Sequence, residues 1–130
     1  MIFDERRTLR TINDAPNAHC IKIFFYLAFN QPQDGIHGYR INRKKLQFEL
    51  KLGRTVFFDA MHWLKDNIIV NELKMADDSD FMVNPYMMMN NGNRDARIAE
   101  WNRRVRLYDD NVKKNRELKR KRELKKANQE

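Results

Sequence analysis

The hydrophobic and polar positions of the chain fall into blocks that predict separate helices and strands. Residues 18–29 are apolar almost all round, so this block predicts the helix that is buried most deeply. The preceding Asn13-Asp14-Ala15-Pro16 is typical of a helix start, because Asp14 can accept hydrogen bonds from free amides of the first turn and proline is tolerated there. Gln31-Pro32-Gln33-Asp34-Gly35 is expected to end this helix.

The middle of the chain predicts a short strand and two helices joined by a tight turn. Residues 38–41 are expected to form the strand, and Asn42 is expected to cap the first helix. Leu46 and Leu50 fall on one face of that helix, which predicts that this face meets the core. Gly53 then supplies a break of the kind that joins two helices at a steep angle.

Residues 54–66 predict the second of these two helices. Its apolar positions recur at the spacing of one helical face and are Val56, Phe57, Ala60, Met61 and Leu64. The opposite face is expected to lie in solvent and carries Arg54, Thr55, Phe58, Asp59, His62 and Lys65. For Phe58 two interpretations stay open, namely packing on a neighbouring element or contact with a ligand.

A hairpin is predicted after this helix. Asn67 is expected to take the left-handed conformation that ends many helices, and the β-branched run Ile68-Ile69-Val70 is expected to begin the first strand. A polar turn follows, and the second strand is expected to end at Pro85. The turn Ala76-Asp77-Asp78-Ser79-Asp80 is acidic but lacks the ligand pattern of a calcium loop, so no metal site is predicted there.

The C-terminal part predicts one more helix. Asn90-Asn91-Gly92-Asn93 is expected to form a turn, and the helix after it is expected to pack on the body through Ile98, Trp101 and Val105. Beyond Tyr108 the apolar positions are too sparse for a core-facing stripe, although helix-forming residues continue to the end.

Charge divides the chain near the same point. Residues 1–93 carry 12 basic and 11 acidic side chains and residues 94–130 carry 14 basic and 7 acidic ones, so +7 of the net charge of +8 lies in the C-terminal part. We therefore expect a body of residues 1–108 and a basic helical or disordered tail of residues 109–130. The tail is interpreted either as an arm for nucleic acid or a protein partner, or as a solubilising segment.

Composition and motifs narrow the class of protein. The chain has 130 residues, of which 42% are hydrophobic, which is enough for one folded domain. No apolar run approaches the roughly 18 residues of a membrane span, the first residues are charged where a secretion signal is apolar, and one cysteine excludes an internal disulfide. We expect a soluble cytoplasmic protein. The sequence contains no glycine-rich phosphate loop, metal-binding histidine spacing or nucleophile motif, so we predict no enzyme, cofactor or metal.

The predicted order of helix, strand, helix, turn, helix and hairpin is that of a winged helix-turn-helix, a mainly α fold with a small β-hairpin and here a basic helical tail. In such folds one helix enters the major groove of duplex DNA and reads base edges with its N-terminal residues. Residues 54–66 are the candidate, with Arg54 and Thr55 at the N-terminus and His62 further along. The expected phosphate ligands, opposed locally only by Glu49, are Arg40, Arg43, Lys44, Lys45, Lys51 and Arg54.

Two segments, LGRTVFFDAMHWLKDNIIV and FMVNPYMMMNNGNRDARIAEW, carry a more specific signal. They resemble the RepL family of Firmicute plasmid and phage replication proteins, whose members are similar to winged-helix regulators. In that family a strand commonly ends in an asparagine–proline pair, followed by an aromatic residue, an apolar run, a glycine and a basic helical segment. The residues that fit these places are Phe81, Asn84, Pro85, Tyr86, Gly92 and Arg94.

The resemblance implies DNA binding at a plasmid or phage origin, in support of replication initiation. Our first interpretation is a sequence-specific, homodimeric protein that initiates or controls replication, binds half-sites about one helical turn apart and recruits replication proteins through the wing or the basic tail. Because phosphates would repel the acidic hairpin turn, we expect a wing that points away from DNA or contacts a protein. Two alternatives stay open: a transcriptional repressor with the same fold, and a protein-interaction module with a vestigial helix-turn-helix.

Overall fold

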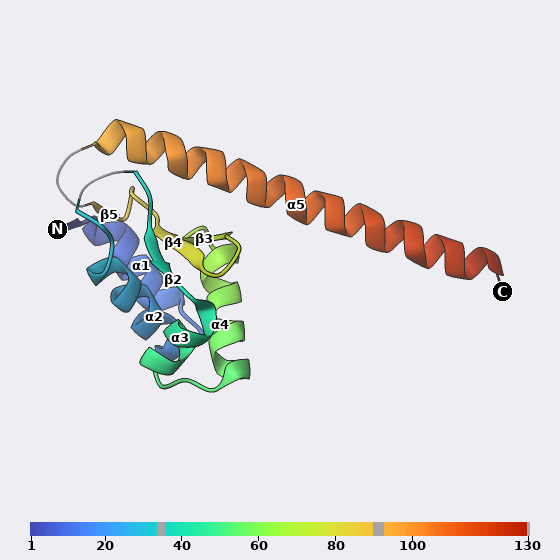
Figure 1. The fold of residues 1–130 in the computed structure, drawn as a ribbon, viewed down its shortest axis with the longest axis horizontal. Helices are drawn as coiled ribbons and strands as arrows, with labels where there is room; N and C mark the ends of the chain where they lie inside the picture. The colour runs from blue at the N-terminus through green and yellow to red at the C-terminus, as the bar shows by residue number, and fades with distance from the viewer. Residues whose placement is uncertain (34–35, 90–92, 130) are drawn as a thin grey trace.

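The computed structural model describes residues 1–33, 36–89 and 93–129, which form a mainly helical protein with small antiparallel sheets (Figure 1). Figure 1 shows one long helix, α5, that crosses the body and extends well beyond it. The elements follow the chain as β1 (Ile2–Phe3), α1 (Glu5–Asp14), α2 (Ala18–Phe29), β2 (Tyr39–Ile41), α3 (Arg43–Glu49), α4 (Arg54–Asp66), β3 (Val70–Lys74), β4 (Ser79–Val83), β5 (Met88–Met89) and α5 (Arg94–Gln129).

The elements from α2 to β4 occur in the predicted order, but two predicted helix ends are wrong. The cap of α2 is Asn17, whose side chain accepts hydrogen bonds from the amides of the first turn, whereas Asp14 is the last residue of α1. After α4, the left-handed residue is Ile68 with φ of 58°, while Asn67 has φ of −92°. Residues 90–92 of the predicted turn and residues 34–35 of the predicted break lie outside the described residues.

The sequence patterns do not predict the N-terminal elements. β1 pairs antiparallel with β5, and Asp4 caps α1 by accepting a hydrogen bond from the amide of Arg7. The buried residues of α1 are the polar Thr8 and Thr11, whereas Leu9 is half exposed. An inward face without large apolar side chains gives no core-facing period, which is why this helix escapes prediction.

The core lies between α2, α4 and the sheet. α2 supplies the largest set of fully buried residues, as predicted, and they are Cys20, Ile23, Phe24, Leu27 and Ala28. α4 packs against α2 through Phe57, Ala60, Met61 and Leu64. The prediction of an inward Val56 is wrong, because Val56 lies at the edge of this stripe and is 39% exposed.

The three-stranded sheet has the order β2-β4-β3 and is antiparallel throughout. The predicted hairpin is confirmed, but its strands are shifted, because β3 begins at Val70 and β4 begins at Ser79. The acidic turn is therefore smaller than predicted: Asp80 lies within β4 and is 1% exposed, which leaves Asp77 and Asp78 on the turn itself.

Gly38 provides a close approach between the start of β2 and the middle of β4. A Cβ at this position would lie 2.3 Å from the carbonyl oxygen of Phe81, and both neighbouring contacts are also backbone atoms that cannot move aside. Gly38→Ala should therefore lower the free energy of unfolding by about 1–3 kcal/mol, the usual cost of overpacking. Chemical denaturation measures this loss.

Gly53→Ala is the matched control, because a Cβ at Gly53 would meet nothing within 4 Å. Its backbone, with φ of −64° and ψ of 157°, is open to alanine, and the entropy that alanine removes from the unfolded chain offsets its poorer capping. We expect an effect near zero. Equal losses for both variants would contradict a steric origin at Gly38.

A buried ion pair anchors α5 to the sheet. Trp101 is buried as predicted, but the inward face of α5 also contains Arg97 and Arg104. Arg104 Nη1 lies 2.8 Å from Asp80 Oδ1, the side chains of both residues are almost completely buried, and Asp80 Oδ1 also accepts a hydrogen bond from the amide of Gly38 at 2.8 Å. The N-terminal part of α5 is thus held on the sheet by an ion pair as well as by apolar contact.

The remainder of α5 leaves the body near Tyr108. The Tyr108 hydroxyl donates a hydrogen bond to Asp66 Oδ1 at 2.6 Å, and burial, followed by this carboxylate, raises the pKa of Tyr108 to about 12. Of the two predicted states of the tail, helix or disorder, the structure has a continuous helix to Gln129, and every side chain of residues 113–129 is exposed. Among the described residues, no helix is both long and apolar enough to cross a membrane.

Candidate nucleic-acid interface

α3 and α4 form a corner whose geometry is fixed by capping and by the turn between them. Asn42 Oδ1 accepts hydrogen bonds from the amides of Lys44 and Lys45 at 3.0 and 3.3 Å, while its Nδ2 donates to the backbone carbonyl of Asp77 in the hairpin. Lys51 takes a left-handed conformation with φ of 55°, which turns the chain toward the start of α4 at Gly53. The sequence therefore ties the first helix to the hairpin and presents the second at an angle to it.

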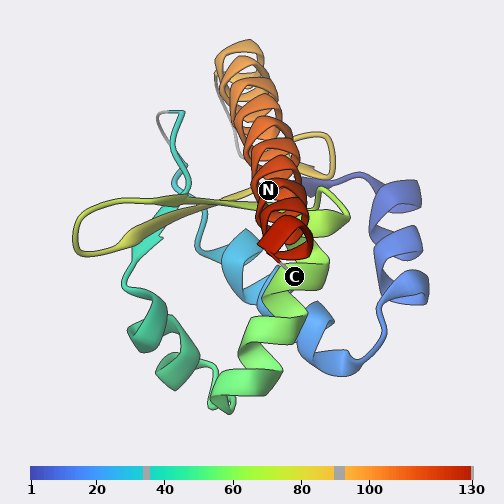
Figure 2. The same ribbon diagram turned by 90° about the vertical axis from the view of Figure 1, so that its right-hand side faces the viewer.

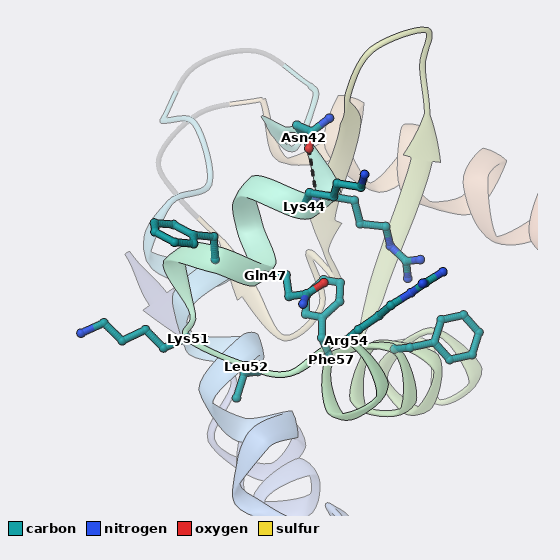
Figure 3. Close-up of a pocket in the computed structure, with 10 residues that line it drawn as sticks. Asn42, Lys44, Gln47, Lys51, Leu52, Arg54 and Phe57 are labelled. Carbon is teal, nitrogen blue, oxygen red and sulfur yellow. Dashed lines mark hydrogen bonds between the residues drawn. The ribbon is translucent and has the colours of Figure 1, made fainter.

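A groove of about 1210 Å³ lies between these two helices (Figure 3). Figure 3 shows residues of α3, of the turn and of α4 around it. The groove combines cationic and apolar side chains and is lined by Asn42, Arg43, Lys44, Gln47, Phe48, Lys51, Leu52, Arg54, Phe57 and Phe58. Such a surface can take an anionic ligand that also offers apolar area.

The outer face of α4 is exposed from Arg54 to His62, as the sequence predicts, but the prediction is wrong at Lys65, which is mostly buried beside Glu72. It begins with Arg54 and Thr55, continues with Asp59 and ends with His62. Phe58 remains 54% exposed and stacks on the His62 ring, with centroids 6.2 Å apart. Both of its interpretations keep support, because Arg43 of α3 lies over the ring while about half of the side chain stays exposed to a ligand.

The structure separates two of the predicted site residues from the rest, namely the predicted phosphate ligand Arg43 and Lys65 of the outer face of α4. Arg43 and Lys65 both pair with Glu72, whose carboxylate is fully buried, and Ser79 donates a hydrogen bond to the other carboxylate oxygen at 2.7 Å. Arg43 also lies over the ring of Phe58, 5.7 Å from its centroid. These contacts join α3, α4 and the hairpin. The side chains of Arg43 and Lys65 are therefore engaged in ion pairs within the protein and do not extend into solvent.

Burial and charge act against each other in this cluster. Burial by itself would raise the pKa of Glu72, but Lys65, Ser79 and Arg43 outweigh it and hold this pKa below its usual value. For Lys65 burial is the largest effect and lowers the pKa, opposed by the attraction of Glu72. Nothing in the sequence pattern of β3 marks Glu72 as buried, because its cationic partners lie outside the strand, on α3 and α4.

The other predicted cations do not all share one surface. Arg40, although exposed, is the register partner of Asp80 and so lies on the face of the sheet that contacts α5, away from the corner. The others are exposed on α3, the turn and α4, none of them pairs with a carboxylate among the described residues, and they are Lys44, Lys45, Lys51 and Arg54. Phe48, which the sequence analysis does not select, lies among them and is 82% exposed. Its position on the outer side of the Leu46–Leu50 stripe is the signal that could have identified it.

Two kinds of reactive site, a metal cluster and an accessible thiol, are absent from the described residues. There, no three His, Cys, Asp or Glu side chains gather as they would around a metal ion. Cys20 is a free thiol buried in α2, and burial raises its pKa, which keeps it in the unreactive thiol form. The surface of the α3–α4 corner is therefore the strongest candidate for function.

Comparison of the chain with protein-family models, curated proteins and solved structures gives no match. The resemblance to the RepL family therefore stays a prediction. The function is therefore inferred from the geometry of α3, α4 and the hairpin.

Proposed function

We propose that the protein is a winged helix-turn-helix protein that binds specific sequences in duplex DNA, with α4 as its recognition helix. The order α2, β2, α3, α4, β3 and β4 supports this fold, as does the pairing of β2 with the second strand of the hairpin. In this arrangement β3 and β4 are the wing. The turn of the wing carries Asp77 and Asp78, which suits a protein partner better than phosphates.

The observation that carries the proposal is the free outer face of α4 beside unpaired cations. Arg54 and Thr55 stand at the N-terminus of the helix, where recognition helices present side chains to base edges. A guanidinium can bind guanine in a bidentate manner, and the methyl group of threonine can contact thymine. Phe58 offers a further apolar contact on the same face.

The cations of the corner provide affinity independent of sequence. Lys44 and Lys51 line the groove beside α4, Lys45 is exposed on α3, and each can neutralise a phosphate. Each such contact makes the dependence of log Kd on log salt steeper by about 0.9. Phosphate contacts of this kind position α4 in the groove, and base contacts then select the sequence.

Together with the RepL resemblance, the surface supports a role in initiating or controlling plasmid or phage replication at an origin. The protein acts as a homodimer that binds two half-sites about one helical turn apart. Replication enzymes are recruited as partners, by the acidic wing turn in particular. The chain itself contributes binding and no catalytic step.

Selection of bound sequences from random duplex DNA tests this proposal with the full chain. We expect enrichment of one motif, repeated in inverted orientation at about one helical turn. A plasmid that carries this motif as its origin and lacks other initiators should be maintained only when the protein is present. Failure to enrich any motif would contradict specific DNA binding; repression of a reporter without plasmid maintenance would identify a transcriptional repressor.

A further inference from the structure

The free part of α5, residues 113–129, projects from the side of the molecule on which α4 lies. The Tyr108 hydrogen bond to Asp66 fixes the point of departure at the C-terminal end of α4. In Figure 2 the C-terminal end of α5 points toward the viewer, and α4 lies directly below it on the near side of the body. Figure 1 shows the same helix extending past α4 into solvent. We call the free part of α5 the arm. The arm and α4 therefore extend from the same side of the body.

The arm has a high positive charge, and its cationic side chains are distributed on all sides of the helix. Residues 113–126 contain nine Lys or Arg and two Glu, a net of +7. Glu117 pairs with Lys121 at 3.4 Å, which leaves most of the cations without a carboxylate partner among the described residues. At about 100° per residue, these cations point in every direction around the axis. A ligand that carries anionic groups on more than one side of the helix suits this distribution.

Two other binding partners, a membrane surface and a second copy of the chain, fit the arm poorly. A membrane surface requires an apolar stripe opposite the cations, but Leu118 and Leu124 are six residues apart and so lie about 120° apart around the helix. A coiled coil with a second copy requires apolar residues at heptad positions. Continuing the spacing of Trp101, Val105 and Tyr108 along the arm instead reaches polar and basic residues.

From this geometry we infer that the arm is a second DNA contact, which lies along the phosphates of the same duplex that receives α4. The inference rests on the proposed function, because it places the duplex on the outer face of α4. The 17 residues of the arm are about 25 Å long, the length of about seven base pairs. The arm therefore extends the bound site beyond the bases that α4 reads and adds affinity without sequence preference.

A full-length variant with three arm cations replaced, Lys119→Gln, Arg120→Gln and Arg122→Gln, tests the inference. Glutamine keeps the helix propensity of the arm. If each cation contacts a phosphate, the salt slope of binding to the selected site should flatten by about 2.7. The matched control, Arg6→Gln, Arg10→Gln and Arg94→Gln, removes the same charge from exposed positions away from the arm and should leave the slope unchanged.

DNA length provides the second readout. Trimming about seven flanking base pairs from the duplex should weaken binding of the natural chain to the level of the arm variant, and should leave the arm variant unaffected. Flattening of the slope without dependence on the flanks would overturn the same-duplex placement, and an unchanged slope would overturn the arm as a DNA contact. So would loss of dimer mass in the arm variant at unchanged DNA affinity, which would assign the arm to a second copy.

These results are separable from a failure of the proposed function. If the natural chain prefers its selected site over random DNA but the arm variant binds like it, only the arm inference is wrong. If the natural chain shows no preference for any duplex, the proposed function is wrong and the same-duplex inference is overturned with it.

Discussion

Replacing Asp80 by alanine should lower the free energy of unfolding by about 3–5 kcal/mol, the usual cost of removing one partner from a buried ion pair. Asp80 is 1% exposed, and its Oδ1 atom accepts hydrogen bonds from both Arg104 and the amide of Gly38. Alanine would leave the buried guanidinium with the more distant Glu100 carboxylate, 3.4 Å from its Nε, and with the backbone carbonyl of residue 80 at 3.5 Å. It would also leave the Gly38 amide without its side-chain acceptor. Urea denaturation measures the loss.

Two comparison variants show whether the loss comes from the buried charge. Asp77→Ala removes an exposed carboxylate of the same hairpin and should change stability by no more than about 0.5 kcal/mol. Replacing the pair together, Asp80→Leu with Arg104→Met, removes both charges and should be less destabilising than Asp80→Ala alone. A double variant at least as unstable as the single one would contradict the electrostatic explanation.

Arg54→Ala should reduce the preference for the selected site over random DNA by about 1–3 kcal/mol, the range measured for a bidentate contact to a base. Arg54 stands at the exposed N-terminus of α4, where it borders the groove between α3 and α4. Its removal leaves Lys44 and Lys51, the proposed phosphate ligands, in place on the groove. Competition binding with specific and random duplexes measures the preference.

Arg54→Lys is the matched control for charge, because lysine keeps the cation but cannot form the planar fork. If Arg54 reads a base, the lysine variant should lose most of the preference while it retains affinity for random DNA. An equal loss of affinity on all sequences in Arg54→Ala, restored by lysine, would show that Arg54 binds a phosphate instead.

The helices at the centre of the fold could be predicted because their signals are local. The bounds of α4 follow from the apolar period that includes Phe57 and Leu64 and from the break at Gly53. α1 could not be found in this way, because it turns Thr8 and Thr11 inward. The same holds for the anchor of α5: an arginine such as Arg104 is normally exposed, and only its distant partner explains its burial.

In the candidate site too, local patterns predict some features, whereas contacts between elements decide others. That Lys44 and Arg54 are exposed follows from their positions opposite the apolar stripes of α3 and α4, and Lys51 lies in the polar turn between these helices. That Lys65 is held in the protein depends on Glu72, which reaches it only when the hairpin folds back on α4. Pairing between a helix and a strand leaves no periodic trace in the sequence.

The carboxylate of Glu72 has a consequence for how the surface meets a ligand. Because it holds Arg43 of α3 and Lys65 of α4 at once, the two helices are already locked at one crossing angle before any ligand arrives. Docking then requires ordering of only the exposed side chains, so little conformational entropy is lost by the backbone. Calorimetry of association should accordingly give a heat-capacity change accounted for by the contact area alone, without the excess that marks coupled folding.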